Sequence, residues 1–175
     1  MEHQILSRKE AMHGHAFNVS SVELRMPDSR IRQYDLVDHP DSVTIIPVDS
    51  NGDIWFVEQY RVGSQSKLIE LPAGVIDEGE TPLACANREI REEIGMAAQA
   101  MDYIGAVYLA PGYVNEKNHI FLATNLVAAP LQHDDDEFIA TKIFAEKKID
   151  TLIQNGQLID SKSIAALHIY HLTFR

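Results

Sequence analysis

Alternation of apolar and polar side chains predicts β-strands along much of the chain. Two alternating segments in the first forty residues flank the turn-rich Pro27-Asp28-Ser29 and predict a small antiparallel pair. Two more apolar segments flank a loop that contains Asn51-Gly52, a dipeptide that favours a hairpin. The expected strands cover residues 17–24, 31–37, 42–48, 54–60, 69–71, 103–110 and 119–126.

Helical periodicity and capping residues predict helices at 82–94, 150–154 and 161–173. Thr81 is suited to be the N-cap of the first helix, with Pro82 at its first position and Gly95 as a left-handed end. Asp160 or Ser161 is expected to cap the last helix. Mixed strands with flanking helices indicate an α/β sandwich. The first helix is expected to bury an apolar stripe of Leu83, Ala84, Ala86, Ile90 and Ile94.

The first helix also carries a cluster of carboxylates. Positions three and four apart share a helix face, so Glu89, Glu92 and Glu93 project together, close to Arg88 and Glu80. Like charges at this spacing destabilise a helix by ~0.2–0.5 kcal/mol per pair, whereas a bound hard cation such as Mg2+ would stabilise them. A solvated amphipathic helix is the alternative, but it does not explain three carboxylates on one face.

Glycines bracket the same helix. Gly74 lacks a Cβ and allows a tight backbone turn that presents the Ala73 carbonyl, while Gly95 closes the helix. The solvated-helix alternative does not explain these glycines either. The segment therefore predicts a loop, a capped helix with a carboxylate face, and a second loop.

Composition predicts one soluble globular domain in a chain of 175 residues, of which 45% are hydrophobic and 23% charged. Apolar runs stay short of a membrane span, and the polar start is unlike a signal peptide. Cys85 is the one cysteine, which excludes an internal disulfide and suits a reducing compartment; it is expected to pack in the helix. We therefore expect a cytoplasmic protein without membrane partners.

The formal net charge of −11 argues against nucleic-acid partners, which require a basic surface. This charge would also repel phosphate groups, unless a metal neutralises the carboxylate cluster and a few arginines meet the phosphates.

Residues 74–96 match every specified position of G-x5-E-x7-R-E-U-x-E-E-x-G-U, where U is a bulky apolar residue. This motif is the Nudix box, so the chain resembles the Nudix hydrolases, which use Mg2+ or Mn2+ to hydrolyse nucleoside diphosphates linked to another group. Four further segments are similar to the ADP-ribose pyrophosphatase branch: 58–61, 70–74, 110–112 and 159–162. The resemblance covers nearly the whole chain but is diffuse before Asp41.

The resemblance implies roles for the box residues. Glu89 and Glu93 are expected to bind metal together with the Ala73 carbonyl. Glu92 is expected to be a further ligand or a carboxylate that acts through water. Arg88 is expected to orient the cluster by pairing with a box carboxylate such as Glu80.

The resemblance also implies a catalytic loop at 110–116. Relatives have a proline about fifteen residues past the box and a glutamate five further on, positions that Pro111 and Glu116 occupy. That glutamate either binds metal or is the general base for the attacking water. Ala110 and Tyr113 depart from the residues expected there, which affects substrate fit more than chemistry. Glu137, in the acidic run at 134–138, is the alternative catalytic carboxylate.

Two residues outside these segments are candidate substrate contacts. Arg61 occupies the branch position of a phosphate contact, which suits a guanidinium. Glu70 is expected to touch either the substrate ribose or a nearby arginine. The eight histidines form no ligand spacing, and no Ser-His-Asp or Cys-His arrangement has local support.

The resemblance further implies an α/β/α sandwich around a mixed sheet in residues 41–175, and an N-terminal antiparallel β segment in residues 1–40. In relatives, strands of this segment are exchanged between protomers, so a homodimer is expected, with substrate specificity partly set there. The expected reaction is Mg2+-dependent hydrolysis of ADP-ribose to AMP and ribose 5-phosphate.

Alternatives remain open. One is GDP-mannose or another sugar nucleotide or dinucleotide as substrate. A non-catalytic ligand sensor with the Nudix fold is another, although it would typically have lost box carboxylates. A calcium-binding domain is a third, but the chain lacks the twelve-residue Asp/Asn/Gly loop.

Overall fold

The computed structural model describes residues 2–132 and 138–174, which form two compact units. The first unit consists of the chain up to residue 41 together with residues 108–117, and the second contains residues 42–107 and the chain from 118 onward. The expected boundary between 40 and 41 lies beside this division. The inclusion of 108–117 in the first unit had no signal in the sequence pattern.

The first unit is built on a three-stranded antiparallel sheet in the order β1-β2-β3, comprising Gln4–His13, Asn18–Arg25 and Ile31–Asp38. Segment 108–117 joins it through backbone hydrogen bonds at Val37, whose N–H donates to the Tyr113 carbonyl at 2.7 Å. The Val37 carbonyl accepts from the Asn115 N–H at 3.3 Å. The two expected strands of this region are therefore present and paired.

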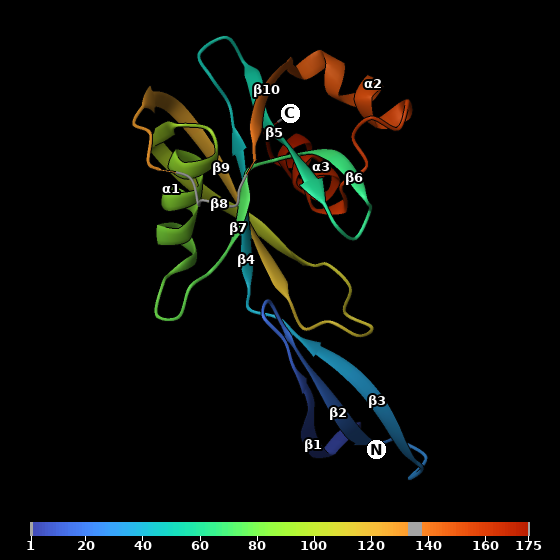
Figure 1. Ribbon diagram of the computed structural model, residues 1–175. Coiled ribbons are helices and arrows are strands. Elements are labelled where there is room, and N and C mark those ends of the chain that lie inside the picture. Colours follow the sequence, from blue (N-terminus) through green and yellow to red (C-terminus); the bar gives the residue numbers. More distant parts are fainter. Residues whose placement is uncertain (1, 133–137, 175) are drawn as a thin grey trace. The chain divides into compact units, whose positions relative to one another are not determined.

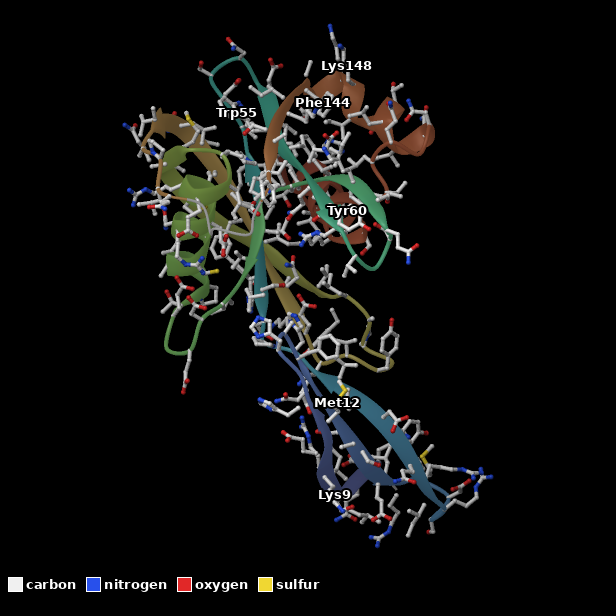
Figure 2. The ribbon with its side chains drawn as sticks, in the orientation of Figure 1. Lys9, Met12, Trp55, Tyr60, Phe144 and Lys148 are labelled. Carbon is white, nitrogen blue, oxygen red and sulfur yellow. The ribbon has the colours of Figure 1, made fainter. Side chains whose placement is uncertain are left out.

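Strand β1 was not predicted. Its register against β2 is irregular between Ile5 and Ser7 and again between Glu10 and Met12. Each irregularity changes which side chains face one side of the sheet, so the sequence loses its alternation. Figure 2 labels Lys9 and Met12 on this strand, and Met12 is 47% exposed.

The second unit is built on a four-stranded sheet in the order β7-β4-β9-β8. β4 pairs antiparallel with β7 and parallel with β9, so the sheet is mixed, as expected. A segment that returns to lie parallel requires a long crossover, and the chain between β4 and β9 supplies one. These strands are β4 Ser42–Pro47, β7 Ala73–Val75, β8 Met96–Tyr108 and β9 Lys117–Ala128.

Helices cover both faces of β4, every residue of which is buried. Helix α1 (Pro82–Glu93) packs Ala86 and Ile90 against Val43 and Ile45. On the opposite face, Ile46 of β4 joins a second hydrophobic cluster with Ala166 and Leu167 of α3 (Ser161–Phe174). Figure 1 shows the two helices on opposite sides of this sheet, which is the α/β/α sandwich predicted.

A three-stranded sheet, β10-β5-β6, completes the second unit: Ala140–Ala145, Asp53–Arg61 and Ser66–Glu70. β10 was not predicted. In Figure 2 Phe144 extends from it, and its ring packs edge-on against Phe56 with centroids 5.7 Å apart. Helix η1 (Glu146–Lys148) and α2 (Ile149–Gln154) follow.

The predicted β4–β5 hairpin is wrong in its pairing but right in its turn. Gly52 has a φ of 79° and its N–H donates to the Asp49 carbonyl at 3.0 Å. Beyond the turn the two strands meet at one bridge, Val48 with Ile54, and then enter different sheets. β5 has buried side chains on both faces, which a two-stranded hairpin could not provide. Within the described residues, no helix is both long and apolar enough to cross a membrane.

Candidate active site

Helix α1 has the predicted ends. Thr81 Oγ1 accepts from the Ala84 N–H at 3.2 Å, Pro82 is the first helical residue, and Gly95 has a φ of 69°. The predicted apolar stripe is only partly correct, because Leu83 is 47% exposed and Ala84 is also exposed. Cys85 is buried in their place, together with Ala86, Ile90 and Ile94.

Gly74 allows the Glu89 carboxylate to lie directly on strand β7. A Cβ at Gly74 would lie 1.8 Å from Glu89 Oε1, far inside van der Waals contact. Gly74 lies within the strand rather than in the tight turn expected, so the absence of a side chain matters for close approach. The Glu89 side chain is thereby held in a nearly buried position, with 8% of the residue exposed.

Arg88 binds three box carboxylates at once. Its Nε and Nη2 donate to Glu80 at 3.1 and 3.0 Å, the pairing that the sequence predicted. Its Nη1 donates to Glu89 at 2.6 Å and to Glu92 at 3.0 Å. These contacts raise the pKa of Arg88, with the hydrogen bond to Glu80 contributing most. The same hydrogen bond lowers the pKa of Glu80 below its usual value.

Glu93 joins helix α1 to the strand that precedes the box. The Ala73 N–H donates to Glu93 Oε2 at 2.9 Å, and only 3% of Glu93 is exposed. The backbone of Ala73 is thereby fixed relative to the helix, and Ala73, Glu89 and Glu93 are brought together as the sequence predicted.

Cys85 lies behind this cluster. Its thiol contacts the Val75 carbonyl at 3.4 Å and Arg88 Nη2 at 3.4 Å. Burial, followed by the charge of Glu89, raises its pKa well above the usual range of a thiol. Cys85 is therefore a packed residue, as expected, and not a nucleophile.

The donor chemistry of this cluster fits a hard cation. Three carboxylates share the Arg88 guanidinium, and carboxylate oxygens are the ligands that such cations prefer. In the described part of the chain, no three His, Cys, Asp or Glu side chains are already arranged around a common metal position. Arg88 lies between Glu89 and Glu92 in this arrangement, so a metal ion would have to compete with it.

Arg61 and Glu70 form an ion pair in the second unit, in which the Glu70 carboxylate is buried and the Arg61 side chain is partly exposed. Arg61 Nε and Nη2 donate to the two Glu70 oxygens at 2.9 and 2.7 Å, so Glu70 contacts an arginine, one of its two expected partners. The Nζ of Lys162 contacts the same carboxylate. Burial alone would raise the pKa of Glu70, but the hydrogen bonds from Arg61 and the charge of Lys162 outweigh it and lower that pKa.

Sequence reasoning missed the role of α3 in this network. Asp160 caps α3 by accepting from the Ser163 N–H at 2.9 Å, which settles the choice between Asp160 and Ser161. Ser163 Oγ accepts from the Leu71 N–H at 2.8 Å, next to Glu70. The sequence contained one indication of this role, the similarity of residues 159–162 to the ADP-ribose pyrophosphatase branch. No role was assigned to the residues of that segment.

Glu116 lies in the first unit, and the box residues lie in the second. Its Oε2 is 3.7 Å from His39 Nδ1, and its side chain is 14% exposed. Asn115, beside it, accepts from the His39 N–H at 2.9 Å and donates to Asp38 at 3.1 Å. The loop is therefore held by the end of β3. Glu137, the alternative catalytic carboxylate, lies outside the described residues.

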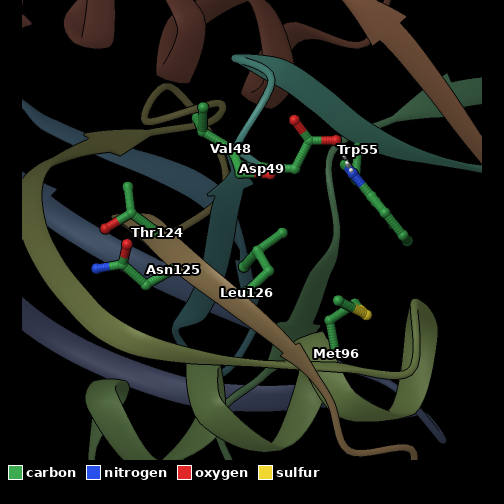
Figure 3. Close-up of a pocket in the computed structure, with 8 residues that line it drawn as sticks. Val48, Asp49, Trp55, Met96, Thr124, Asn125 and Leu126 are labelled. Carbon is green, nitrogen blue, oxygen red and sulfur yellow. Dashed lines mark hydrogen bonds between the residues drawn. The ribbon is translucent and has the colours of Figure 1, made fainter.

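A pocket of about 370 Å3 in the second unit contains none of the predicted site residues. Figure 3 shows Trp55 beside Asp49, whose carboxylate accepts from the indole N–H at 3.1 Å. Hydrogen bonds within the turn already engage that carboxylate. The pocket is lined by Val48, Asp49, Ser50, Trp55, Met96, Thr124, Asn125 and Leu126.

Comparison with known proteins identifies the class. The NUDIX domain matches residues 38–167, and the chain therefore belongs to the Nudix family, as predicted. It is 27% identical to an ADP-ribose pyrophosphatase of Bacillus subtilis, over 98% of this chain and 94% of that protein. It is 32% identical to an ADP-ribose pyrophosphatase of Mycobacterium tuberculosis, over 93% of this chain and 80% of that protein.

A solved structure confirms the fold. The crystal structure of an ADP compounds hydrolase superposes with a TM-score of 0.88 at 24% identity, covering 98% of this chain and 94% of that one.

Proposed function

We propose that this Nudix hydrolase cleaves the diphosphate linkage of ADP-ribose, giving AMP and ribose 5-phosphate, or that of a related nucleoside diphosphate sugar. The observation that carries the proposal is similarity along nearly the whole chain to two ADP-ribose pyrophosphatases, in a chain whose box is intact. Mg2+ is the proposed cofactor, and Mn2+ is expected to substitute for it.

Box residues are proposed to hold the metal. Glu89 and Glu93 supply carboxylate oxygens and Ala73 supplies its carbonyl, and Glu116 is a further ligand if it is not the general base. When bound, the metal neutralises diphosphate charge and lowers the pKa of a bound water. Support comes from the two buried glutamates and from the hydrogen bond that fixes the Ala73 backbone against Glu93.

Arg88 is proposed to orient the carboxylates. Its three-way contact with Glu80, Glu89 and Glu92 fixes the direction of each side chain and offsets part of their mutual repulsion. Glu92 keeps both predicted roles open, as a further ligand or as a carboxylate that acts through water.

Arg61 is proposed to bind substrate phosphate. The pair with Glu70 uses Nε and Nη2, and 42% of the Arg61 side chain remains exposed. A guanidinium has five donors in a planar fork, so donors outside the pair suit phosphate oxygens. Glu70 is proposed to act on substrate through Arg61.

Glu116 is proposed to be the general base that takes the proton of the attacking water. If it instead binds metal, Glu92 and Glu137 are the alternative bases. A general base must be ionised at the working pH and must reach the water when substrate is bound.

The first unit is proposed to be a dimerisation and substrate element, and the enzyme to be a cytoplasmic homodimer. Support comes from the small amount of buried apolar surface in this unit. Among its described residues, Val22 is the single hydrophobic residue of the sheet that is buried. A three-stranded sheet usually needs a covered hydrophobic face to be stable, and a second copy of the chain would supply it.

A substrate panel tests this proposal. Purified protein is assayed with ADP-ribose, GDP-mannose, UDP-glucose and a dinucleoside polyphosphate, with and without Mg2+, and products are separated by chromatography. We expect ADP-ribose to give AMP and ribose 5-phosphate only with metal present. Preference for GDP-mannose would change the assigned substrate, and binding of all four without cleavage would indicate a sensor.

Glu93→Gln is the matched inactive variant for the panel, because it keeps the side-chain shape and loses the charge. Loss of a first metal ligand is expected to lower turnover by at least ~100-fold while the fold persists. Glu78→Gln is the control, since Glu78 is an exposed residue in the same motif. Near-normal turnover by Glu93→Gln at saturating Mg2+ would refute the metal assignment.

A further inference from the structure

The Glu70 carboxylate is shared by two cations from different elements. Arg61, at the end of β5, donates twice to it, and Lys162, in the first turn of α3, contacts its Oε2. The Glu70 side chain is 1% exposed and that of Lys162 is 14% exposed. Lys162 also contacts Asp160 at 3.0 Å. A lysine this buried is unusual at a helix surface and needs an explanation.

The second cation fixes the carboxylate that binds Arg61 without adding net charge. Arg61 and Lys162 carry two positive charges, and Glu70 and Asp160 carry two negative charges, so the four groups balance. Lys162 contacts Glu70 Oε2, the oxygen that also accepts from Arg61 Nη2, and so limits how far this carboxylate can turn. Arg61 is the more exposed of the two cations, at 42%, so it is the one available to a diphosphate.

Lys162 is also fixed in place rather than free to leave. Asp160 caps its helix, and the next residue after Lys162, Ser163, accepts the hydrogen bond of the Leu71 N–H. The α3 terminus is therefore joined to the backbone beside Glu70. This geometry keeps the backbone of Lys162 beside Glu70, and the ion pair formed there is better shielded from water and salt than an exposed pair.

We infer that Lys162 is a positioning residue that holds Glu70, and through it the Arg61 guanidinium, in the orientation that binds substrate diphosphate. Lys162 does not touch substrate itself. The inference rests on the proposed function only for the identity of the substrate, because any diphosphate ligand would meet the same Arg61.

The test is a double-mutant cycle on KM for ADP-ribose at saturating Mg2+. Lys162→Met removes the charge and keeps the apolar stem, and is expected to raise KM about tenfold with little change in kcat. In an Arg61→Ala background, Lys162→Met should leave KM unchanged, because its effect passes through Arg61. Lys162→Arg should restore most of the wild-type KM.

Structural damage is separated from positioning by a matched variant. Ser163→Ala removes the acceptor of the Leu71 N–H but keeps both cations on Glu70, so it should lower Tm more than it raises KM. If the Lys162→Met variant does not fold, Lys162→Gln replaces it in the double-mutant cycle. Additive effects of the Lys162 and Arg61 substitutions on KM, or an unchanged KM in the Lys162 variant, would overturn the inference.

The same four proteins of the cycle are also titrated with inorganic pyrophosphate and Mg2+ by calorimetry. We expect Lys162→Met to raise the Kd for pyrophosphate in the wild-type background and to leave it unchanged in the Arg61→Ala background. If the wild type binds pyrophosphate with this pattern but does not hydrolyse ADP-ribose, the proposed substrate fails and the positioning role stands. If the wild type does not bind pyrophosphate, or the effects on Kd are additive, the positioning role fails.

Discussion

The two units differ in how their sheets are stabilised. In the second unit, β4 is buried along its whole length between two hydrophobic clusters. In the first unit, nine of the ten residues of β1 are exposed. Side-chain hydrogen bonds link the strands of this sheet, as between Ser7 and Glu23 at 2.9 Å. Ile5, Ile31 and Tyr34 remain exposed there.

This difference shows which unit can fold through its own core. Burial of apolar surface contributes about 25 cal/mol per Å2, and exposed cross-strand pairs contribute much less. The second unit therefore supplies its own stability, whereas the first buries little apolar surface within its described residues. The proposed general base lies in the less buried unit and the proposed metal ligands in the more buried one.

Deleting the residues before Asp41 is expected to have the largest effect, because it removes the three-stranded sheet of the first unit. If the N-terminal sheet forms the dimer, the shortened chain should run as a monomer of less than 19.7 kDa, in place of a dimer of twice that mass. Affinity for substrate should be lost as well. Light scattering and the ADP-ribose assay measure the two effects, and circular dichroism checks that the second unit still folds. A full-length monomer with full activity would contradict the dimer proposal.

Glu116→Gln tests the chemical role of the first unit. If Glu116 is the general base, the Glu116→Gln substitution should lower kcat by ~10²–10⁴-fold with little change in KM. Arg61→Ala, in the second unit, should mainly raise KM, because Arg61 is proposed to bind phosphate in ground and transition states alike.

Steady-state kinetics over a range of Mg2+ concentrations separates the two possible roles of Glu116. Glu10→Gln, on exposed β1, is the control and should behave as wild type. A loss in Glu116→Gln that disappears at high metal concentration would show that Glu116 is a ligand. A kcat within a few-fold of wild type would place the base elsewhere.

Gly74→Ala tests whether the position of the Glu89 carboxylate in the second unit matters for metal binding. The added Cβ would overlap the Glu89 carboxylate, which is the far end of a flexible side chain, so the carboxylate should move and the fold should persist. Displaced metal ligands typically cost ~10–100-fold in metal affinity or activity. Gly63→Ala is the control, because no atom lies within 4 Å of its added Cβ. Equal activity of the two variants at limiting Mg2+ would mean that Glu89 does not bind metal.

The smallest expected effect is the pH dependence contributed by Glu70. Its folded-state pKa is lowered from 4.5, so its ionisation stabilises the fold above that pH. This contribution is lost as pH falls through the lowered folded-state value. Glu70→Gln should therefore be less stable than wild type at neutral pH, by roughly 1–3 kcal/mol, and the difference should shrink below about pH 4.5. Urea denaturation across this range measures it, and a constant difference would contradict the assignment.

The parts of the fold that depend on local pattern were predictable from sequence. The ends of α1 follow from Thr81, Pro82 and Gly95, each of which acts on its own turn of chain. β1 and β10 were missed because the first has irregular register and the second pairs with β5 across a long separation. The β4–β5 pairing failed for a related reason, since a turn signal does not determine which sheet each strand enters.

The candidate site divides in the same way. The carboxylate face of α1 follows from helical spacing, and the contact of Arg88 with Glu80 was implied by the resemblance to the Nudix box. The approach of Glu89 to Gly74 and the contact of Lys162 with Glu70 join segments far apart in the chain. No spacing rule reports such contacts. The packing of α1 against β7 creates the first, and the packing of α3 beside β6 creates the second.

The position of Cys85 gives the protein an internal reporter of local opening. It is the one cysteine in the chain and lies beneath Arg88 against β7. Alkylating reagents require an accessible thiolate, so modification has to wait until the helix separates from the strand. The labelling rate therefore measures how often the carboxylate cluster comes apart. A divalent ion that closes the cluster should slow the labelling, which would reveal metal binding without any substrate.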